Sequence, residues 1–393
     1  MREKEMRVDW LRPACDRPGP FATVLIDATH DTEDAAELAR LRRRAVADDL
    51  TDQGAPAAVR DLVDAALADV APADGTAGRV LVVDDDGVLV DRLTPVPPAT
   101  ALTRWGLLPQ FLAVVTEVPE VVRTVTVHVD EAGGEVAVPG EEPVTVGGEM
   151  PVHKVPAGGP SHLSMQERVE ESWRRNTAAV AEAVDRAVQR TGADVVVLTG
   201  DARARARLRD RLARRSVEVL VEIENSAGDR GADLPDTVAR AEDDVRDRHR
   251  RTALDRFAQA AGHGDGLAVT GEADVLAAAR AQAVETLLVD PAAVPADDVW
   301  VGADPAAVAA DEAGLAAMGS SPAGRVSVVD ALLRAAVATD AEVVVTGGGG
   351  RRDPLDPDAP GRSDDPEDSG DPQEGPALRH GLGAILRFAL APT

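Results

Sequence analysis

Short apolar runs rich in β-branched residues alternate along this chain with longer stretches whose apolar residues recur at helical spacing. Apolar runs that are bounded by Gly, Pro or polar residues favour a buried strand over a helix. Such runs predict strands at 21–27, 194–201, 218–224, 285–289, 298–301 and 342–346. The periodic stretches predict helices at 34–50, 57–70, 100–115, 164–190, 202–215, 235–261, 272–283 and 326–338. Strands that alternate with helices in this way indicate an α/β fold with some parallel pairing.

Two further segments have the alternating pattern of β-hairpins. In the first, residues 78–93, two alternating or apolar runs flank Asp85, Asp86 and Gly87, and Asp-Gly suits a tight turn. In the second, residues 122–138, the turn is expected at Gly133 and Gly134. The three consecutive carboxylates at 84–86 could also hold a cation, but the hairpin turn is the simpler interpretation of them.

The length of 393 residues argues for two or three domains. We divide the chain into three α/β domains, at 1–118, 119–262 and 263–393. Between residues 353 and 374 there are nine acidic residues, five prolines and one arginine. This composition is too polar to bury and too rich in proline for a helix or a sheet. We therefore expect a disordered acidic insertion at about 347–376.

Composition narrows the classes of function. The chain has 42 Lys and Arg residues against 69 Asp and Glu, a formal net charge of −27. Aromatic residues make up 2% of it and Tyr is absent, which excludes recognition by stacking bases on an aromatic surface. The single cysteine, Cys15, has no partner for a disulfide and none at metal-ligand spacing. No apolar stretch approaches the length of a membrane span. We expect a cytoplasmic protein with no membrane partner, no metal and no cofactor.

The segment VHKVPAGGPSHLSMQERVEESWRRN, residues 152–176, carries the most information. Two glycines, Gly158 and Gly159, precede a long helix, and a basic residue, Lys154, precedes the glycines. This arrangement resembles the central domain of the archaeal and eukaryotic peptide-chain release factors and of their relative Pelota, which have a Gly-Gly-Gln loop, or its remnant, ahead of a basic helix. The resemblance extends from about residue 122 to the end. It implies an RNase H-like fold for the central domain and an α/β sandwich for the last.

The N-terminal strand and hairpin are similar to those of a bacterial branch of this superfamily, which includes the ribosome hibernation factor Balon and mycobacterial homologues. This resemblance implies a translation factor that binds in the vacant A site of the bacterial ribosome, with elongation factor Tu as a companion. Loop residues would approach 23S rRNA near the peptidyl transferase centre, and arginines of the helix would contact phosphates. The loop residues are Lys154, Gly158, Gly159, Pro160, Ser161 and His162, and the arginines are Arg168, Arg174 and Arg175.

Position 160 bears on whether the protein is an enzyme. In the hydrolytic relatives the residue after the two glycines is Gln, which positions water against the ester bond of peptidyl-tRNA. Here it is Pro160, which has neither a backbone N–H nor a side-chain donor. We therefore expect a factor without catalytic residues that occupies the A site in dormancy or stress. One alternative is a peptidyl-tRNA hydrolase of ribosome rescue or termination that uses Ser161 or His162. Another is a stress-associated binding protein that never meets ribosomes.

The distribution of charge indicates where RNA could bind. Residues 151–215 contain 13 basic and 8 acidic residues, a net +5, so the rest of the chain carries −32. Phosphate repels an acidic protein as a whole, and RNA binding therefore requires a local basic patch; no DNA partner is expected. The competing interpretation of the arginines between 203 and 215 is a solvated helix face. The four glycines at 347–350 lack the Lys and the Ser or Thr of a phosphate-binding loop.

Overall fold

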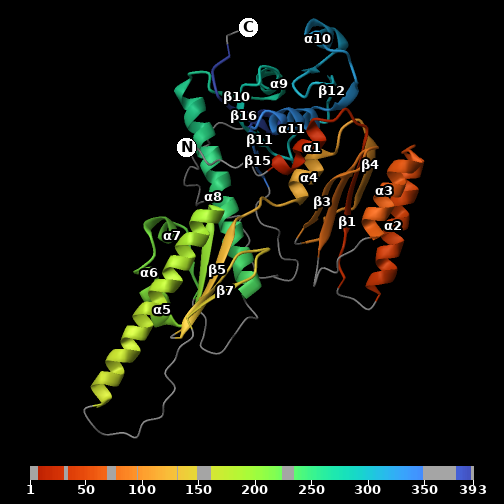
Figure 1. Ribbon diagram of the computed structural model, residues 1–393. Coiled ribbons are helices and arrows are strands. Elements are labelled where there is room, and N and C mark those ends of the chain that lie inside the picture. Colours follow the sequence, from red (N-terminus) through yellow and green to blue (C-terminus); the bar gives the residue numbers. More distant parts are fainter. Residues whose placement is uncertain are drawn as a thin grey trace, which may run out of the picture. The chain divides into compact units, whose positions relative to one another are not determined.

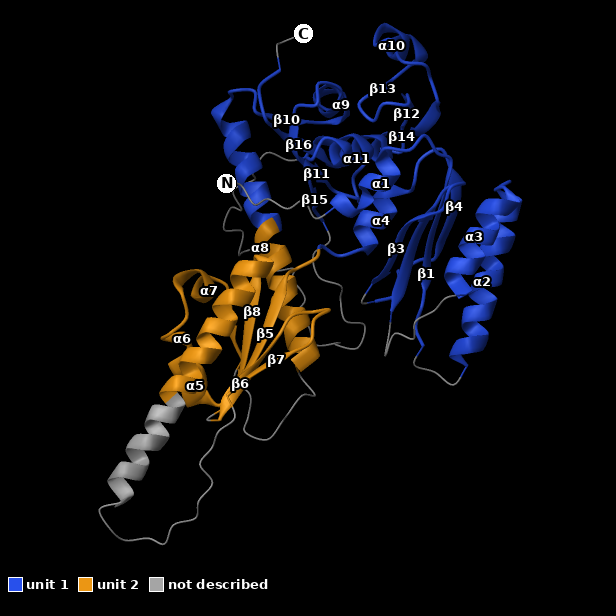
Figure 2. Cartoon of the chain, viewed as in Figure 1, with its two compact units in different colours: residues 1–120, 250–393 blue, residues 121–249 orange. Residues whose placement is uncertain are grey.

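The computed structural model describes residues 8–30, 34–68, 77–94, 96–130, 132–147, 161–223, 234–347 and 378–390 (Figure 1). In the helix that begins at Ser161, side chains are described from residue 174 onward. The chain groups into two compact units, residues 1–120 with 250–393 and residues 121–249 (Figure 2). Residues of the first and last predicted domains contact one another and group into one unit. Whether they are two separate domains within that unit stays a prediction. The predicted acidic insertion, apart from its first residue Gly347, lies outside the described residues.

An antiparallel sheet of order β3-β2-β1-β4 forms the N-terminal part of the first unit. Side chains of β1 point alternately into two cores on opposite faces of the sheet. Ala22 and Val24 lie in the core formed with α2 and α3, and Phe21 and Leu25 lie in the other core. The predicted first strand, first hairpin and first two helices are confirmed. The elements are the short helices η1 (Asp9–Leu11) and α1 (Arg12–Cys15), then β1 (Phe21–Asp27), α2 (Ala35–Asp52), α3 (Ala57–Ala68), β2 (Gly78–Val83) and β3 (Val88–Thr94).

Residues 100–115 do not form the single helix that their spacing predicts. A strand, β4 (Leu102–Gly106), comes first, and the helix α4 is shorter and later (Phe111–Glu117). β4 pairs antiparallel with β1, with Phe21 opposite Gly106 and Leu25 opposite Leu102. The prediction was wrong because it used only the spacing of apolar residues within the segment. The segment is a strand because it pairs with β1, which is far away in the sequence.

The C-terminal part of the same unit contains a mixed sheet of order β10-β16-β11-β15 and a small antiparallel sheet of order β13-β12-β14. In the mixed sheet β11 and β15 are parallel, as the βα alternation predicts, and the other neighbours are antiparallel. The elements are β10 (Ala268–Thr270), α9 (Glu272–Arg280), β11 (Val284–Val289), β12 (Asp298–Val301), β13 (Val308–Ala309), α10 (Glu312–Ala317), β14 (Gly324–Ser327), α11 (Val328–Ala338), β15 (Glu342–Val345), the short helix η2 (Arg379–Gly381) and β16 (Leu382–Leu386).

Helix α11 links the two parts of the first unit. Every residue from Val328 to Val337 is buried, the charged residues Asp330 and Arg334 included. The apolar side chains of this helix share one core with Leu11 and Phe111 of the N-terminal part. Because of this shared core, residues 1–120 and 250–393 make a single compact unit.

The second unit is a five-stranded sheet with helices on both faces. Its order is β7-β6-β5-β8-β9, in which β5, β8 and β9 are parallel and β6 is antiparallel to both neighbours. Counted within the unit this order is 3-2-1-4-5, the arrangement expected of an RNase H-like fold. Val196 and Leu198 of β8 face a core with α5, whereas Val195 and Val197 face one with α8, so these four consecutive residues are all apolar. The elements are β5 (Thr124–Val129), β6 (Gly133–Ala137), β7 (Val144–Gly147), α5 (Ser161–Thr191), β8 (Val195–Gly200), β9 (Leu220–Glu222) and α8 (Leu234–His263), which continues into the first unit.

Residues 202–215 form two helices, α6 (Ala202–Arg209) and α7 (Arg214–Glu218), instead of the predicted one. The interruption has a cause on the neighbouring helix. Asp185 of α5 accepts hydrogen bonds from the Ala213 N–H at 3.1 Å and from the Ser216 hydroxyl at 2.6 Å. A side chain of another helix thus holds the start of α7 in place, an interaction that local spacing does not reveal. Among the described residues, no helix combines the length and the apolar character needed to cross a membrane.

Candidate functional site

Much of the predicted loop, with Lys154, Gly158, Gly159 and Pro160, lies outside the described residues. Ser161 and His162 are the first two residues of α5, and Arg168 follows on the same helix; the side chains of these three also lie outside the description. Arg174 and Arg175, further along α5, are described, and both are exposed. The structure therefore places five of the nine predicted site residues on one continuous helix.

Asn176 fixes α5 to the sheet next to Arg174 and Arg175. Its side-chain amide donates a hydrogen bond to the carbonyl oxygen of Ala132 at 2.8 Å, in the turn between β5 and β6. Asp130 holds that turn, because its carboxylate accepts the N–H of Ala132 at 2.7 Å and that of the next residue at 2.9 Å. The two arginines are thus carried by a part of α5 that is fixed to the sheet.

We expect Asn176→Ala to lower the free energy of unfolding by about 1 kcal/mol, because one side-chain hydrogen bond is lost and the Ala132 carbonyl loses its partner. Hydrogen exchange should quicken in the β5–β6 turn. The matched control is Gln189→Ala, on an exposed position of the same helix, which should change neither quantity. Equal stabilities and equal exchange in the two variants would show that Asn176 does not hold the helix.

The carboxyl ends of β5 and β8 meet α5 and α6 at the same junction. Asp130, Thr177 and Arg207 are among the residues that line a pocket of about 10 Å³ there, room for about one water molecule. A larger, open groove of about 430 Å³ runs between α5 and the β6–β7 edge, and the ion pair of Glu141 with Arg190 lies on its rim. Neither hollow is lined by a described nucleophile together with a histidine or lysine base. The described residues therefore give no catalytic constellation here.

The arginines of α6 fall into two sets. Arg205 and Arg209, one helical turn apart, both approach the carboxylate of Glu222 on β9, with N–O distances of 3.6 and 3.0 Å. Arg205 is buried by this arrangement. Arg203 and Arg207, on the other face of the helix, are exposed. The interpretation of this stretch as a solvated helix face is therefore wrong for Arg205. It stays open for the exposed residues Arg203 and Arg207.

The sequence count of +5 over residues 151–215 overstates the local positive charge. Carboxylates from outside that range form ion pairs with its arginines: Glu141 with Arg190, Glu222 with Arg205 and Arg209, and Glu218 with Arg214. The positive surface is consequently narrower than the count suggests.

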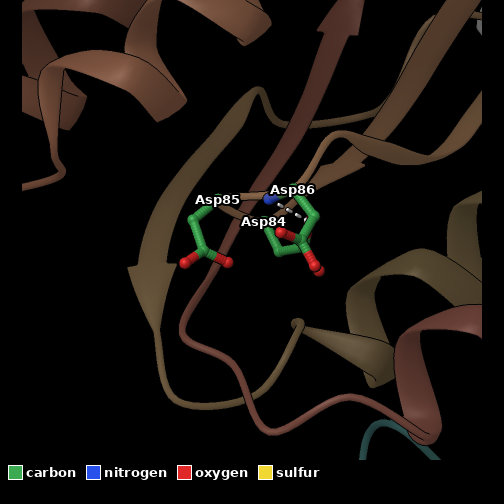
Figure 3. Close-up of side chains that lie close together, drawn as sticks. All are labelled: Asp84, Asp85 and Asp86. Carbon is green, nitrogen blue, oxygen red and sulfur yellow. Dashed lines mark hydrogen bonds between the residues drawn. The ribbon is translucent and has the colours of Figure 1, made fainter.

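Asp84, Asp85 and Asp86 lie close enough together to share a cation (Figure 3). Two of these carboxylates are already engaged, since Arg17 Nη1 lies 2.6 Å from Asp84 and 2.8 Å from Asp86. Asp84 also accepts the N–H groups of Asp86 and Gly87, at 2.9 and 3.0 Å, and so closes the hairpin turn. The predicted turn is confirmed, and its geometry accounts for Asp84 and Asp86.

Cys15 does not provide an accessible nucleophile. It is fully buried at the end of α1, and burial raises the pKa of its thiol to about 12. The reactive thiolate is therefore a negligible species near neutral pH.

Comparison with known proteins identifies relatives for most of the chain. Residues 123–263 match the model of the family described as bacterial archaeo-eukaryotic release factor family 2. Two uncharacterized proteins of Mycobacterium tuberculosis, MT2704 of strain CDC 1551 and Rv2629 of strain H37Rv, are each 31% identical to this chain over 294 residues. The match covers 72% of this chain and 78% of each relative.

Solved structures of low sequence identity also match. The archaeal translation termination factor aRF1 has 16% identity and a TM-score of 0.21, with 97% of both chains covered. Pelota of Archaeoglobus fulgidus has 16% identity and a TM-score of 0.37, with 81% of this chain and 86% of that one covered. Archaeal Pelota in a ribosome-bound model has 13% identity and a TM-score of 0.41, over 98% and 95%. The length and identity of the mycobacterial matches, with the family model over the central unit, show that the chain belongs to bacterial archaeo-eukaryotic release factor family 2.

Proposed function

We propose that this protein is a translation factor that occupies the vacant A site of the bacterial ribosome, in hibernation or stress, without hydrolysing peptidyl-tRNA. The observation that carries the proposal is the sequence Gly158-Gly159-Pro160 in a member of a release-factor family. The glycines let the backbone approach RNA closely, whereas Pro160 removes both donors that a glutamine would offer.

Exposed arginines on α5 support the same proposal. Arg174 and Arg175 lie on the helix that begins with Ser161 and His162, and Asn176 fixes that part of the helix to the sheet. Guanidinium groups bind phosphate through two parallel hydrogen bonds, so a fixed pair of them is suited to the rRNA backbone. Lys154 and Arg168 would extend these contacts toward the peptidyl transferase centre.

Cosedimentation with 70S ribosomes that carry labelled peptidyl-tRNA tests the proposal. We expect salt-sensitive association and an intact ester bond. Arg174→Gln combined with Arg175→Gln should weaken association about tenfold, since two phosphate contacts are lost. The matched control, Arg44→Gln with Arg325→Gln, removes the same charge from exposed positions of the first unit and should bind like wild type.

The rival function predicts a different result in the same assay. Peptide release by the wild-type protein that Ser161→Ala or His162→Ala abolishes would identify a hydrolase and overturn the non-catalytic proposal. No association at low salt would remove the ribosome as a partner. Elongation factor Tu, added to the same assay, should raise the bound fraction if it is the companion that the resemblance implies.

A further inference from the structure

A row of exposed arginines covers α6, the turn after it and the start of α7. Residues 202–215 contain seven arginines and a single acidic residue, Asp210, in a chain of net charge −27. Five of the seven are exposed and do not share the Glu222 carboxylate. We call them the α6–α7 arginine surface: Arg203, Arg207, Arg211, Arg214 and Arg215.

The backbone beneath this surface is fixed at both ends. At the start of α6, Asp201 accepts the N–H groups of Arg203 and Ala204 at 2.9 and 3.0 Å. At the start of α7, Asp185 accepts the Ala213 N–H and the hydroxyl of Ser216, which is itself buried. Both helices pack against α5. The arginines therefore project from a rigid scaffold, so little backbone entropy is lost when they bind a regular ligand.

Two acidic side chains next to this surface, Glu218 and Glu222, are already paired with arginines. Glu222 pairs with Arg205 and Arg209 of α6, and Glu218 pairs with Arg214 at 2.8 Å. Among the residues that the structure describes, Arg203 and Arg211 make no ion pair. An exposed i,i+4 pair such as that of Arg214 contributes only a few tenths of a kcal/mol and yields easily to a phosphate.

The chemistry of the surface points to phosphate and away from bases. The described side chains of residues 121–249 include no Phe, Tyr or Trp, so none of them offers the arginines a stacking platform for bases. Arginines held in fixed positions along a rigid element are suited to a partner whose phosphates are also held at regular, fixed spacing. A double-helical RNA segment has these properties, and contacts to its backbone carry no sequence preference.

We propose that the α6–α7 arginine surface binds the phosphate backbone of double-helical RNA, as a contact separate from the Gly-Gly loop. The identity of that RNA as rRNA rests on the proposed function, whereas duplex binding itself does not. The surface would supply salt-sensitive, sequence-independent affinity, and the loop would supply the position within the ribosome.

Fluorescence anisotropy of the full chain with a labelled RNA duplex, over a series of salt concentrations, tests the inference. The variant is Arg203→Gln/Arg211→Gln/Arg214→Gln, and the matched control is Arg44→Gln/Arg251→Gln/Arg325→Gln, which removes three exposed charges from the first unit. We expect the variant to bind about tenfold more weakly and the slope of log K against log salt to fall by about 2 to 3, with the control near wild type. The lysine version of the variant should recover most of the affinity.

Each outcome decides the question. Equal binding by the variant and the control would overturn the inference, and tighter binding of a DNA duplex of the same sequence would overturn the assignment to RNA. Circular dichroism of the variant, expected to match wild type, separates lost contacts from lost structure. Duplex binding that depends on the surface, without ribosome association, would refute the proposed function alone. Ribosome association that the variant leaves intact, together with intact duplex binding, would refute this inference alone.

Discussion

Arg334→Met is expected to lower the free energy of unfolding of the first unit by about 3 kcal/mol. Arg334 is buried, with 2% of the residue exposed, and its guanidinium donates to three backbone carbonyls. It bonds the Cys15 oxygen through Nε at 3.1 Å, and the oxygens of Gly302 and Ala303 through Nη1 and Nη2 at 3.0 and 2.7 Å. Methionine fills a similar volume but offers no donor, so the buried carbonyls lose their partners.

Urea unfolding followed by tryptophan fluorescence measures this effect, because Trp10, Trp105 and Trp300 all belong to the first unit. Arg325→Met is the control: its arginine is exposed in β14, and the change should be within about 0.5 kcal/mol of wild type. Arg334→Lys should be intermediate, since one ammonium cannot reach three carbonyls arranged around a planar fork. Coincident transitions for Arg334→Met and Arg325→Met would refute the role of Arg334.

The polar contacts of α11 explain how two segments far apart in the sequence come to share one unit. Arg334 bonds the end of α1, Asp330 bonds the start of α4, and Arg12 pairs with Asp340 just beyond α11. All three contacts join the N-terminal part to the C-terminal part. In the sequence, an acid and an arginine four residues apart on a helix are the usual pattern of an exposed ion pair. Their burial depends on partners more than 200 residues away.

The parts of the fold that could be predicted are those in which local pattern and tertiary environment agree. The strand at 194–201 is apolar from Val195 to Leu198 because helices cover both of its faces, and the hairpin at 78–93 has a turn that Asp84 closes locally. Residues 102–106 became a strand through β1, and residues 202–215 were divided by Asp185. Both errors come from partners outside the local window.

The candidate site shows the same division. The sequence placed Arg174 and Arg175 on the helix after the loop, and the structure confirms that position. It could not show that Asn176 anchors this helix through Ala132, since the bond joins residues 44 positions apart. Nor could a charge count show which arginines are engaged, because the carboxylate of Glu222 comes from a strand beyond the counted segment.

Asp330→Asn is expected to stabilise the first unit by about 2 kcal/mol at pH 7.5, and the gain should disappear near pH 4. Asp330 is 5% exposed, and its carboxylate accepts the Leu112 N–H at 2.9 Å, at the start of α4, where Gln110 provides no side-chain cap. Burial raises the pKa of this carboxyl from 3.8 to about 6, against the opposing effect of hydrogen bonds from the backbone of Leu112 and Phe111. Asparagine keeps an acceptor for Leu112 and removes the cost of burying the charge.

The sign of the pH dependence follows from that shift. Between about pH 4 and pH 6 the folded chain holds a proton that the unfolded chain has released, so this carboxyl's contribution to stability is complete below pH 4 and is lost as the pH rises through 6. Raising the pKa of this carboxyl from 3.8 to about 6 corresponds to about 3 kcal/mol, part of which the weaker hydrogen bond of the amide offsets.

Urea midpoints from pH 4 to pH 7.5 for wild type, Asp330→Asn and Asp330→Ala separate the charge from the hydrogen bond. Asp330→Ala loses the acceptor and should be less stable than Asp330→Asn at every pH, by about 1 to 2 kcal/mol. Asp255→Asn, at an exposed position of α8, should follow wild type throughout. If the difference between Asp330→Asn and wild type did not change with pH, the carboxyl would not titrate in this range, and hydrogen bonds to the start of α4 would outweigh its burial.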